Sequence, residues 1–232
     1  MPVAIITGAS KGLGRALAEG LARRGWDLVL DARGAQALAG TAEAVSAHGV
    51  RVRALPGDVT DAAHRSELVE AAWRLGGLDL LVHNASALGI EPLVRLEELP
   101  LPGLRRALEV NLVACLGLVQ EGLALLRASA AGAVVVVSSD AAAEAYETWG
   151  GYGASKAALD QLAAVLAVEE PGLRVWAVDP GDMATDLYAA AVPEDQEPRP
   201  APETVVPGFL RLLDERPASG RYAAAALVDG VV

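Results

Sequence analysis

The sequence predicts an α/β fold: a doubly wound parallel sheet of about seven strands with helices on both faces. Two observations predict it. Short apolar runs alternate along the chain with helix-compatible stretches of about ten or more residues rich in Ala, Leu, Glu and Arg, and strands separated in this way pair in parallel through crossover connections. The runs are also continuously apolar rather than alternating, which is typical of strands covered by helices on both faces.

The expected elements follow one another without a linker or repeat, so residues 1–232 are predicted to form one domain. Helices are expected over ranges such as Leu13–Arg24 and Asp61–Leu75. Val192–Pro202 holds four prolines, which prevent a helix and predict a loop; a plain solvent loop and a substrate lid are both open. The runs expected to form strands are Val3–Ile6, Trp26–Leu30, Val52–Leu55, Leu78–Val82, Ala133–Val137, Arg174–Val178 and Tyr222–Val228.

Composition excludes several classes of protein. The 232 residues include 30 acids and 19 bases, for a net charge of −11, and phosphate contacts dominate nucleic-acid affinity, so a nucleic-acid partner is not expected. Cys115 is the only cysteine, which excludes an intrachain disulfide and a cysteine metal cluster. No uncharged apolar stretch reaches the roughly 18 residues of a membrane span, and no signal-peptide layout opens the sequence. We therefore expect a cytoplasmic protein without a membrane or metal partner.

The first strand runs into a glycine-rich segment, Thr7–Gly14, that is followed at once by a helix. Gly8 permits a tight turn, Gly12 removes a side chain where a phosphate must approach, and Gly14 lets the helix lie close to the sheet. The free N–H groups of that helix then face a pyrophosphate. The residues predicted to bind a dinucleotide here are Gly8, Ser10, Lys11, Gly12, Leu13 and Gly14.

The end of the second strand indicates which dinucleotide binds. Selectivity for NAD needs a carboxylate there to hold the ribose 2′-hydroxyl, and Asp31 could be that group. However, Arg33 follows closely, and Lys11 lies in the turn expected to face the same ribose. Two cations suit a 2′-phosphate, so we favour NADP(H), while NAD(H) stays open.

Ser139, Tyr152 and Lys156 form a candidate catalytic group. Tyr152 and Lys156 are four residues apart at the start of an apolar helix, so they share one face. A free tyrosine, with a pKa of about 10, is a poor base at neutral pH, and a nearby ammonium lowers that pKa. Lys156 is one of two lysines among 19 basic residues, and its compact charge differs chemically from the arginine fork. The Ser139 hydroxyl, at the end of a strand, can hold a substrate oxygen.

Together these motifs resemble the short-chain dehydrogenase/reductase family, in its single-domain Rossmann-type branch, from Val3 to about Leu187. The resemblance implies an oxidoreductase that interconverts a carbonyl and a secondary alcohol by hydride transfer. The further segments that carry the resemblance, in family order, are Asp58-Val59, Asn84-Ala85, Asn111, Pro180-Gly181 and Thr185.

The resemblance also implies a role for each matching residue. Tyr152 would be the general acid/base, and Ser139 would bond the reacting oxygen. Lys156 would lower the tyrosine pKa and bond the nicotinamide ribose, and Asn111 would hold a water that links Lys156 to solvent. Asp58 would contact the adenine. The residues implied to contact the cofactor outside the glycine-rich turn are Arg33, Asp58, Val59, Asn84, Ala85, Tyr152, Lys156, Pro180, Gly181 and Thr185.

Two alternatives stay open: an NAD-dependent alcohol dehydrogenase of the same family, and a non-catalytic protein that senses NADP(H). The latter would need the glycine-rich turn but not Ser139, Tyr152 and Lys156 together. The substrate is expected to be a small carbonyl or alcohol compound whose identity the sequence does not indicate. Leu112–Leu126 and Ala157–Val168 are apolar on nearly all sides, which predicts a homodimer or homotetramer built through these helices.

Overall fold

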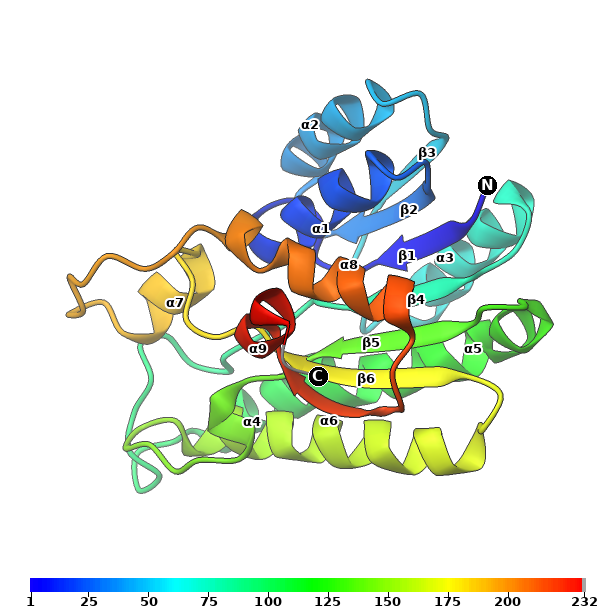
Figure 1. Ribbon diagram of the computed structural model, residues 1–232. Helices are drawn as coiled ribbons and strands as arrows, with labels where there is room; N and C mark the ends of the chain where they lie inside the picture. Colours follow the sequence, from blue (N-terminus) through cyan, green and yellow to red (C-terminus); the bar gives the residue numbers. More distant parts are fainter. Residues whose placement is uncertain (231–232) are drawn as a thin grey trace.

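A computed structural model describes residues 1–230 and contains, within that range, a seven-stranded parallel sheet in the order β3-β2-β1-β4-β5-β6-β7 (Figure 1). The order of the strands changes direction between β1 and β4. Such a position is called the switch point of the sheet, and α/β sheets bind ligands there, outside the carboxyl ends of the strands. The predicted doubly wound sheet is confirmed. The strands are β1 (Val3–Ile6), β2 (Asp27–Ala32), β3 (Val52–Pro56), β4 (Leu80–His83), β5 (Ala133–Val137), β6 (Arg174–Asp179) and β7 (Gly220–Ala223).

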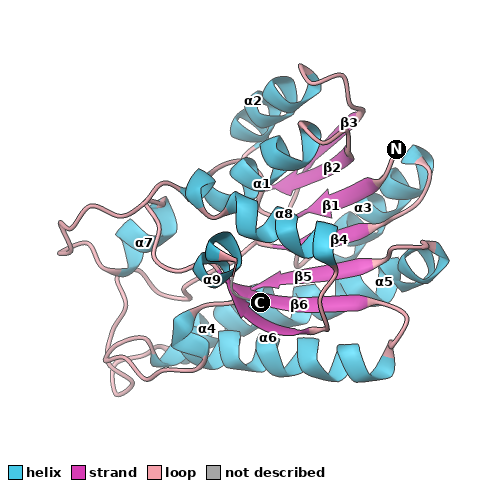
Figure 2. Ribbon diagram, in the orientation of Figure 1, coloured by secondary structure: helices cyan, strands magenta, loops and turns pink. Residues whose placement is uncertain are grey.

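Helices cover both faces of the sheet (Figure 2). On one face, α1, α2, α8 and α9 enclose a core with the even-numbered residues of β1 and β2. On the other, α3, α5 and α6 pack on the odd-numbered ones, because successive strand side chains point to opposite faces. The helices are α1 (Gly12–Ala22), α2 (Ala35–Ser46), α3 (Ala62–Leu75), α4 (Leu101–Leu108), α5 (Ala114–Ala128), α6 (Gly150–Glu169), α7 (Asp186–Ala191), α8 (Val206–Glu215) and α9 (Ala224–Asp229).

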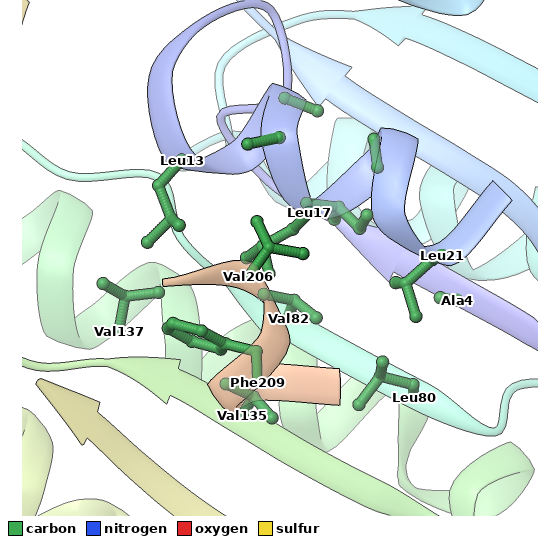
Figure 3. Packing of buried hydrophobic residues seen from close by; sticks show 14 of the residues in the cluster. Ala4, Leu13, Leu17, Leu21, Leu80, Val82, Val135, Val137, Val206 and Phe209 are labelled. Carbon is green, nitrogen blue, oxygen red and sulfur yellow. The ribbon is translucent and has the colours of Figure 1, made fainter. Parts of the chain in front are cut away.

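The contact of α1 with α8 closes the first of these cores. Figure 3 shows Leu13 and Leu17 of α1 facing Val206 and Phe209 of α8 above Val82 of β4. All five side chains are buried. Burying a side chain of this kind stabilises a fold by about 1.5–3 kcal/mol, so the contact fixes the start of α1 against the sheet.

Helices α4 and α5 belong to one long helical stretch that is largely apolar. The α4 and α5 segments are joined by a π-helical turn, Glu109–Val113, and the whole stretch Leu101–Ala128 is long and apolar enough to cross a membrane. In the structure Cys115, Leu118 and Val119 are buried against the sheet. The composition is therefore that of a helix that packs in the core.

The C-terminal strand prediction is wrong beyond its first two residues. Only Tyr222 and Ala223 of the expected run Tyr222–Val228 lie in β7, and Ala224–Asp229 is helical. Alanine has the highest helix propensity, so the alanine run continues as a helix once the sheet edge has been paired. The other boundaries agree to within about two residues. A single domain over residues 1–232 stays a prediction, whose last two residues, Val231 and Val232, lie outside the described range.

Candidate active site

A cavity of about 560 Å³ lies at the carboxyl ends of the strands, on both sides of the switch point. It is lined by the glycine-rich turn, the ends of β2, β4 and β5, the start of α6, and the segment from β6 into α7. Every predicted site residue lines it except Gly14 and Asn111. The sequence motifs, although scattered over most of the chain, therefore converge on one cavity.

The glycine-rich turn is held against the end of β4. Gly8 and Gly12 have positive φ values of 65° and 54°, a region that favours glycine. The Asn84 side chain donates to the carbonyls of Thr7 (2.9 Å) and Gly8 (3.1 Å). A Cβ on Gly14 would lie 2.4 Å from the Gly8 oxygen and 2.5 Å from Asn84 Nδ2. Gly14 therefore allows the start of α1 to contact Gly8 and Asn84 directly. The sequence alone predicts only that Gly14 lets the helix lie close to the sheet.

The carboxylate at the end of β2 is paired inside the fold, although Asp31 also lines the cavity. Asp31 Oδ1 lies 2.6 Å from His64 Nε2, and both side chains are buried. A Cβ on Gly57 would lie 2.4 Å from the His64 ring, so Gly57 makes room for the imidazole. Burial raises the pKa of Asp31. The neighbour Ala32 points to the opposite face of the strand, and the sequence offered no signal for this buried pair because its members lie 33 positions apart.

Arg33 and Lys11, which were predicted to act together, both line the cavity. Arg33 is exposed at the cavity rim and makes no ion pair with any residue in the described range. Lys11 Nζ instead lies 2.5 Å from Asp186 Oδ2 at the start of α7. The segment into α7 approaches the turn closely, since a Cβ on Gly12 would lie 3.4 Å from the Thr185 methyl carbon. Lys11 thus links the turn to α7 in this structure, and its joint action with Arg33 stays a prediction.

Asp58 is fixed by partners that the sequence did not reveal. Its carboxylate accepts hydrogen bonds from the backbone and hydroxyl of Thr60 and lies 2.9 Å from Arg106 Nη2 of α4. Partial burial opposes ionisation, but the Thr60 bonds and the Arg106 charge outweigh it and lower the pKa of Asp58 to about 2. Asp58 is therefore an ionised carboxylate at the cavity wall.

Ser139, Tyr152 and Lys156 meet in the cavity where β5 ends and α6 begins. The Ser139 hydroxyl donates to Asp140 Oδ1 (3.0 Å) and accepts from the Ala141 N–H (3.2 Å). Lys156 Nζ lies 5.5 Å from the centre of the Tyr152 ring. It also donates to the Val137 carbonyl at 2.7 Å. A hydroxyl, a phenol and an ammonium group thus share one wall.

The expected lowering of the tyrosine pKa does not occur in this protein environment. Burial raises the pKa of Tyr152 to about 12; the nearby Ser86 and Ser139 hydroxyls lower it, and the charges of Asp140 and Asp179 raise it. Burial also lowers the pKa of Lys156 to about 8. Burial is the largest of the influences on the tyrosine, so Tyr152 is a neutral phenol that can donate a proton at neutral pH.

The side chain of Asn111 is bonded to protein groups on both its amide atoms. It lies in the π-helical turn and is fully buried. Its amide nitrogen donates to Ser155 Oγ (2.8 Å) and the Ala87 carbonyl (3.0 Å). Its oxygen accepts from the Ala87 N–H (2.8 Å) and the Ser86 hydroxyl (3.2 Å). These four bonds use the amide's full capacity, so the side chain links α6 to the loop after β4, and the water that Asn111 is expected to hold stays a prediction.

The remaining wall of the cavity combines aromatic, apolar and acidic side chains. Trp149 packs edge-on against Tyr152 with 5.7 Å between ring centres. Tyr188 of α7 bonds Asp195 (2.6 Å) and Arg199 (2.8 Å) of the proline-rich segment, so that segment is tied to α7. It is irregular as predicted. The other residues on this wall are Ser86, Leu88, Asp140, Asp182, Met183, Leu187 and Ala191.

Comparison with known proteins gives consistent matches. The family model for short chain dehydrogenases matches residues 2–196. The chain is 36% identical over 223 residues to the glycine betaine reductase ATRR of Emericella nidulans, covering 91% of this chain but only 17% of that protein. It is 36% identical over 187 residues to the rhamnolipids biosynthesis 3-oxoacyl-[acyl-carrier-protein] reductase of Pseudomonas aeruginosa, covering 77% of this chain and 72% of that one.

Solved structures agree with the sequence matches. An alcohol dehydrogenase of Thermococcus sibiricus, complexed with 5-hydroxy-NADP, superposes with a TM-score of 0.86 at 29% identity and covers 96% of this chain and 95% of its own. A protein of Escherichia coli CFT073 described as a short chain dehydrogenase, complexed with NADPH, gives a TM-score of 0.88 at 29% identity over 96% of both chains.

The close approach at Gly14 gives a test of the turn. We expect Gly14→Ala to lower the free energy of unfolding by about 1–3 kcal/mol, because the new methyl group overlaps the Gly8 oxygen and Asn84. Gly40→Ala in α2 is the matched control: nothing lies within 4 Å of its Cβ position, and we expect it to stabilise by about 0.5–1 kcal/mol. Urea unfolding measures both. Equal stability of the two variants would contradict the packing described for the turn.

Proposed function

Because this chain belongs to the short-chain dehydrogenase/reductase family, we propose that this oxidoreductase uses NADP(H) to interconvert a carbonyl and a secondary alcohol. The observation that carries the proposal is the convergence of Ser139, Tyr152 and Lys156 on one wall of the cavity. A protein that only sensed the dinucleotide would need the glycine-rich turn but not this wall. An NAD-dependent alcohol dehydrogenase is the alternative.

The turn after β1 fits the pyrophosphate of a dinucleotide. A Cβ at Gly8 would lie 2.9 Å from Asn84 Nδ2, so the backbone stays bare where a phosphate approaches. No side chain caps the first turn of α1, which leaves its N–H groups for an anion. Leu13 and Ser10 line the same part of the cavity, and Val59, Ala85, Pro180, Gly181 and Thr185 would complete the dinucleotide site.

The cavity end at β2 favours a 2′-phosphate over a 2′-hydroxyl. The carboxylate of Asp31 already bonds His64 through Oδ1, and this bond competes with a ribose hydroxyl. Arg33, at the rim, carries a guanidinium group that suits bidentate phosphate binding. The two solved structures described above, complexed with NADPH and 5-hydroxy-NADP, support the same preference.

Residues of this chain would then transfer the proton to or from the reacting oxygen. When bound, the nicotinamide supplies or accepts the hydride. Tyr152, kept protonated by its burial, would donate its proton to the carbonyl oxygen during reduction. Ser139 would turn its hydrogen from Asp140 to the same oxygen and stabilise the charge that develops there. Lys156 would support the phenolate in the oxidative direction and bond the ribose of the nicotinamide.

A substrate panel tests the proposed function. Purified protein is offered ketones, aldehydes and secondary alcohols with NADPH, NADH and their oxidised forms, and the absorbance of the reduced nicotinamide is followed. We expect turnover of at least one carbonyl compound, faster with NADPH than with NADH. Tight NADPH binding without turnover of any compound would favour the sensing protein instead, and faster turnover with NADH would favour the NAD-dependent alternative.

The role of Arg33 predicts a selective loss of affinity. Removing one charge-assisted contact costs about 1.5–3 kcal/mol, so we expect Arg33→Ala to weaken NADPH binding by roughly 10- to 150-fold and NADH binding far less. Fluorescence titration measures both. Arg23→Ala, which removes an exposed arginine paired with Glu19 on α1, is the control and should bind as wild type. Equal weakening of NADPH and NADH by Arg33→Ala would reject the 2′-phosphate site.

The proton role of Tyr152 predicts a loss of turnover without a loss of binding. We expect Tyr152→Phe to lower kcat by about 10²- to 10⁴-fold while NADPH binds nearly as in wild type. Lys156→Ala should impair both steps. The control is Tyr222→Phe in β7, which removes a hydroxyl that donates to the carbonyl of Ala218, just before that strand. Near-normal reduction by Tyr152→Phe would exclude this residue as the acid.

We also propose that the protein self-associates through α5 and α6. Large apolar side chains are exposed to solvent on both: Leu116 on α5 with Val113 in the π-helical turn before it, and Val165 and Val168 on α6. Apolar patches of this kind mark association surfaces, and one patch meeting its copy gives a two-fold dimer. Leu166, by contrast, packs partly against the core, so substituting it would test folding rather than association.

Light scattering tests the association. We expect a mass that is a multiple of 23.8 kDa at micromolar concentration. Leu116→Arg should shift the protein toward smaller species, because it places a charge in the apolar contact. Ala39→Arg, on the exposed side of α2, is the control and should leave the mass unchanged. A wild-type mass of one chain would exclude the proposed dimer or tetramer.

A further inference from the structure

Arg221 joins three elements of the active-site region through one guanidinium group. It lies on β7, at the edge of the sheet. Its Nη2 donates to the Ser139 carbonyl at 2.9 Å and to Asp179 Oδ2 at 3.1 Å. Its Nε donates to Asp160 Oδ2 at 3.0 Å. The three acceptors belong to the end of β5, the end of β6 and helix α6, and each of these elements also carries a residue of the cavity wall.

We propose that Arg221 is a positioning residue that holds Ser139, the Lys156-bearing helix and the turn after β6 in their reactive arrangement. The inference rests on the proposed carbonyl chemistry, because it assigns Arg221 a part in that reaction. Arg221 itself does not line the cavity, so its effect would pass through the residues that it holds.

The contact with Ser139 fixes a backbone on which the hydroxyl depends. Ser139 has an extended backbone, with φ −161° and ψ 154°, and its hydroxyl accepts from the Ala141 N–H. The Ser139 carbonyl also accepts from the Ala142 N–H at 3.0 Å and from the Ser138 hydroxyl at 3.4 Å, but Arg221 is its only charged donor among the described residues. Rotation of this peptide would move the hydroxyl, and displacement of a reacting group by about 1 Å costs on the order of 10²-fold in rate.

The contact with Asp160 acts on the catalytic helix. Asp160 follows Lys156 by four residues in α6, so the two share a face. Its Oδ2 accepts from the Ser138 hydroxyl (2.8 Å) as well as from Arg221. Its Oδ1 is buried without a partner among the described residues. A buried carboxylate is costly unless it is paired, and Arg221 supplies that charge while drawing α6 toward the end of β5.

The contact with Asp179 orients the turn after β6. One oxygen of Asp179 accepts from the Gly181 N–H (3.0 Å) and the other from Arg221. Asp179 and Pro180 line the cavity with Gly181, and Gly181 has a positive φ of 72°. Arg221 therefore restrains, through Asp179, the turn that leads into Thr185 and α7.

The fork of the guanidinium explains why arginine is suited to this position. It presents donors in fixed directions to several acceptors at once, whereas a lysine ammonium is a single point on a flexible stem. Lysine at this position would keep the charge beside Asp160 but could not hold all three acceptors with the same geometry. Arg221→Lys should therefore restore only part of what Arg221→Ala removes.

A purely structural ion pair at the sheet edge is the competing explanation, and Arg216 provides a matched control. Arg216 also bonds backbone carbonyls beside β5, those of Ala131 (2.9 Å) and Gly132 (3.3 Å), and it lies 6.0 Å from the Trp176 ring. These contacts are at the amino end of β5, away from the cavity. Arg216→Ala should therefore lower stability without disturbing the reaction.

The test combines hydrogen exchange with kinetics on Arg221→Ala, Arg221→Lys and Arg216→Ala. Exchange is measured by mass spectrometry on the unliganded proteins, and kcat and KM are measured for NADPH-dependent reduction of a ketone from the panel. For Arg221→Ala we expect faster amide exchange at residues 138–142 and 179–182. Its kcat should fall on the order of 10- to 100-fold with little change in the KM for the ketone. Arg221→Lys should be intermediate in both readouts.

In the Arg216→Ala variant, amide hydrogens should exchange faster only near residues 131–133, and kcat should equal that of the wild type. Wild-type exchange at both segments in Arg221→Ala, or a kcat loss no larger than that of Arg216→Ala, would overturn the proposal. If Arg221→Ala fails to fold, Arg221→Lys carries the same comparison. If wild-type protein reduces no carbonyl compound, the proposed function fails, whereas exchange still decides whether Arg221 holds the two segments.

Discussion

The active-site region depends on one close contact, that of the glycine-rich turn with the end of β4. Gly14 brings the start of α1 so near to Gly8 and Asn84 that no side-chain carbon would fit between them. Asn84 then satisfies the carbonyls of Thr7 and Gly8, which would otherwise be unpaired at the switch point of the sheet. The contact fixes the uncapped end of α1 beside β4 and so defines one side of the cavity.

Burial rather than charge pairing governs ionisation on the other side. Tyr152 and Lys156 are both buried, and in each case burial shifts the pKa toward the neutral form. His83 behaves in the same way, since burial lowers its pKa to about 3 and its ring nitrogens have no hydrogen-bond partner among the described residues. His83 is therefore a core histidine, as its position in the buried strand β4 indicates. Lys156 still keeps its ammonium at neutral pH, because its pKa of about 8 lies above 7, whereas Tyr152 stays a neutral phenol.

The sequence allowed the fold and most of the cavity wall to be predicted because the relevant signals are local. Thr7–Gly14 and the pair Tyr152 and Lys156 are short segments whose spacing already constrains their geometry. The missed features are contacts between distant positions. His64 with Asp31 and Lys11 with Asp186 are brought together only by the folded chain, and no local pattern distinguishes these side chains from solvent-facing ones.

The wrong strand prediction after Ala223 also arises from a contact between distant positions. The run after Tyr222 is apolar enough for a strand, but pairing with β6 ends at Ala223, and an alanine run without a partner strand forms a helix. The same edge strand supplies Arg221, which no motif indicated because its importance depends on where three other elements end.

Helix α6 is bonded to other elements at two positions, and these bonds explain how the cavity wall that it forms keeps its geometry. On one side Asn111 bonds Ser155 and the loop after β4; on the other Arg221 bonds Asp160. Tyr152 and Lys156 lie on the same helix between these restraints. On the opposite side, α7 is tied to the glycine-rich turn by Lys11 and to the proline-rich segment by Tyr188 and Arg199. The fold thus holds Tyr152 and Lys156, to which we assign the proton transfer, by different elements from those that organise α7, and such separation is how one scaffold can serve different substrates.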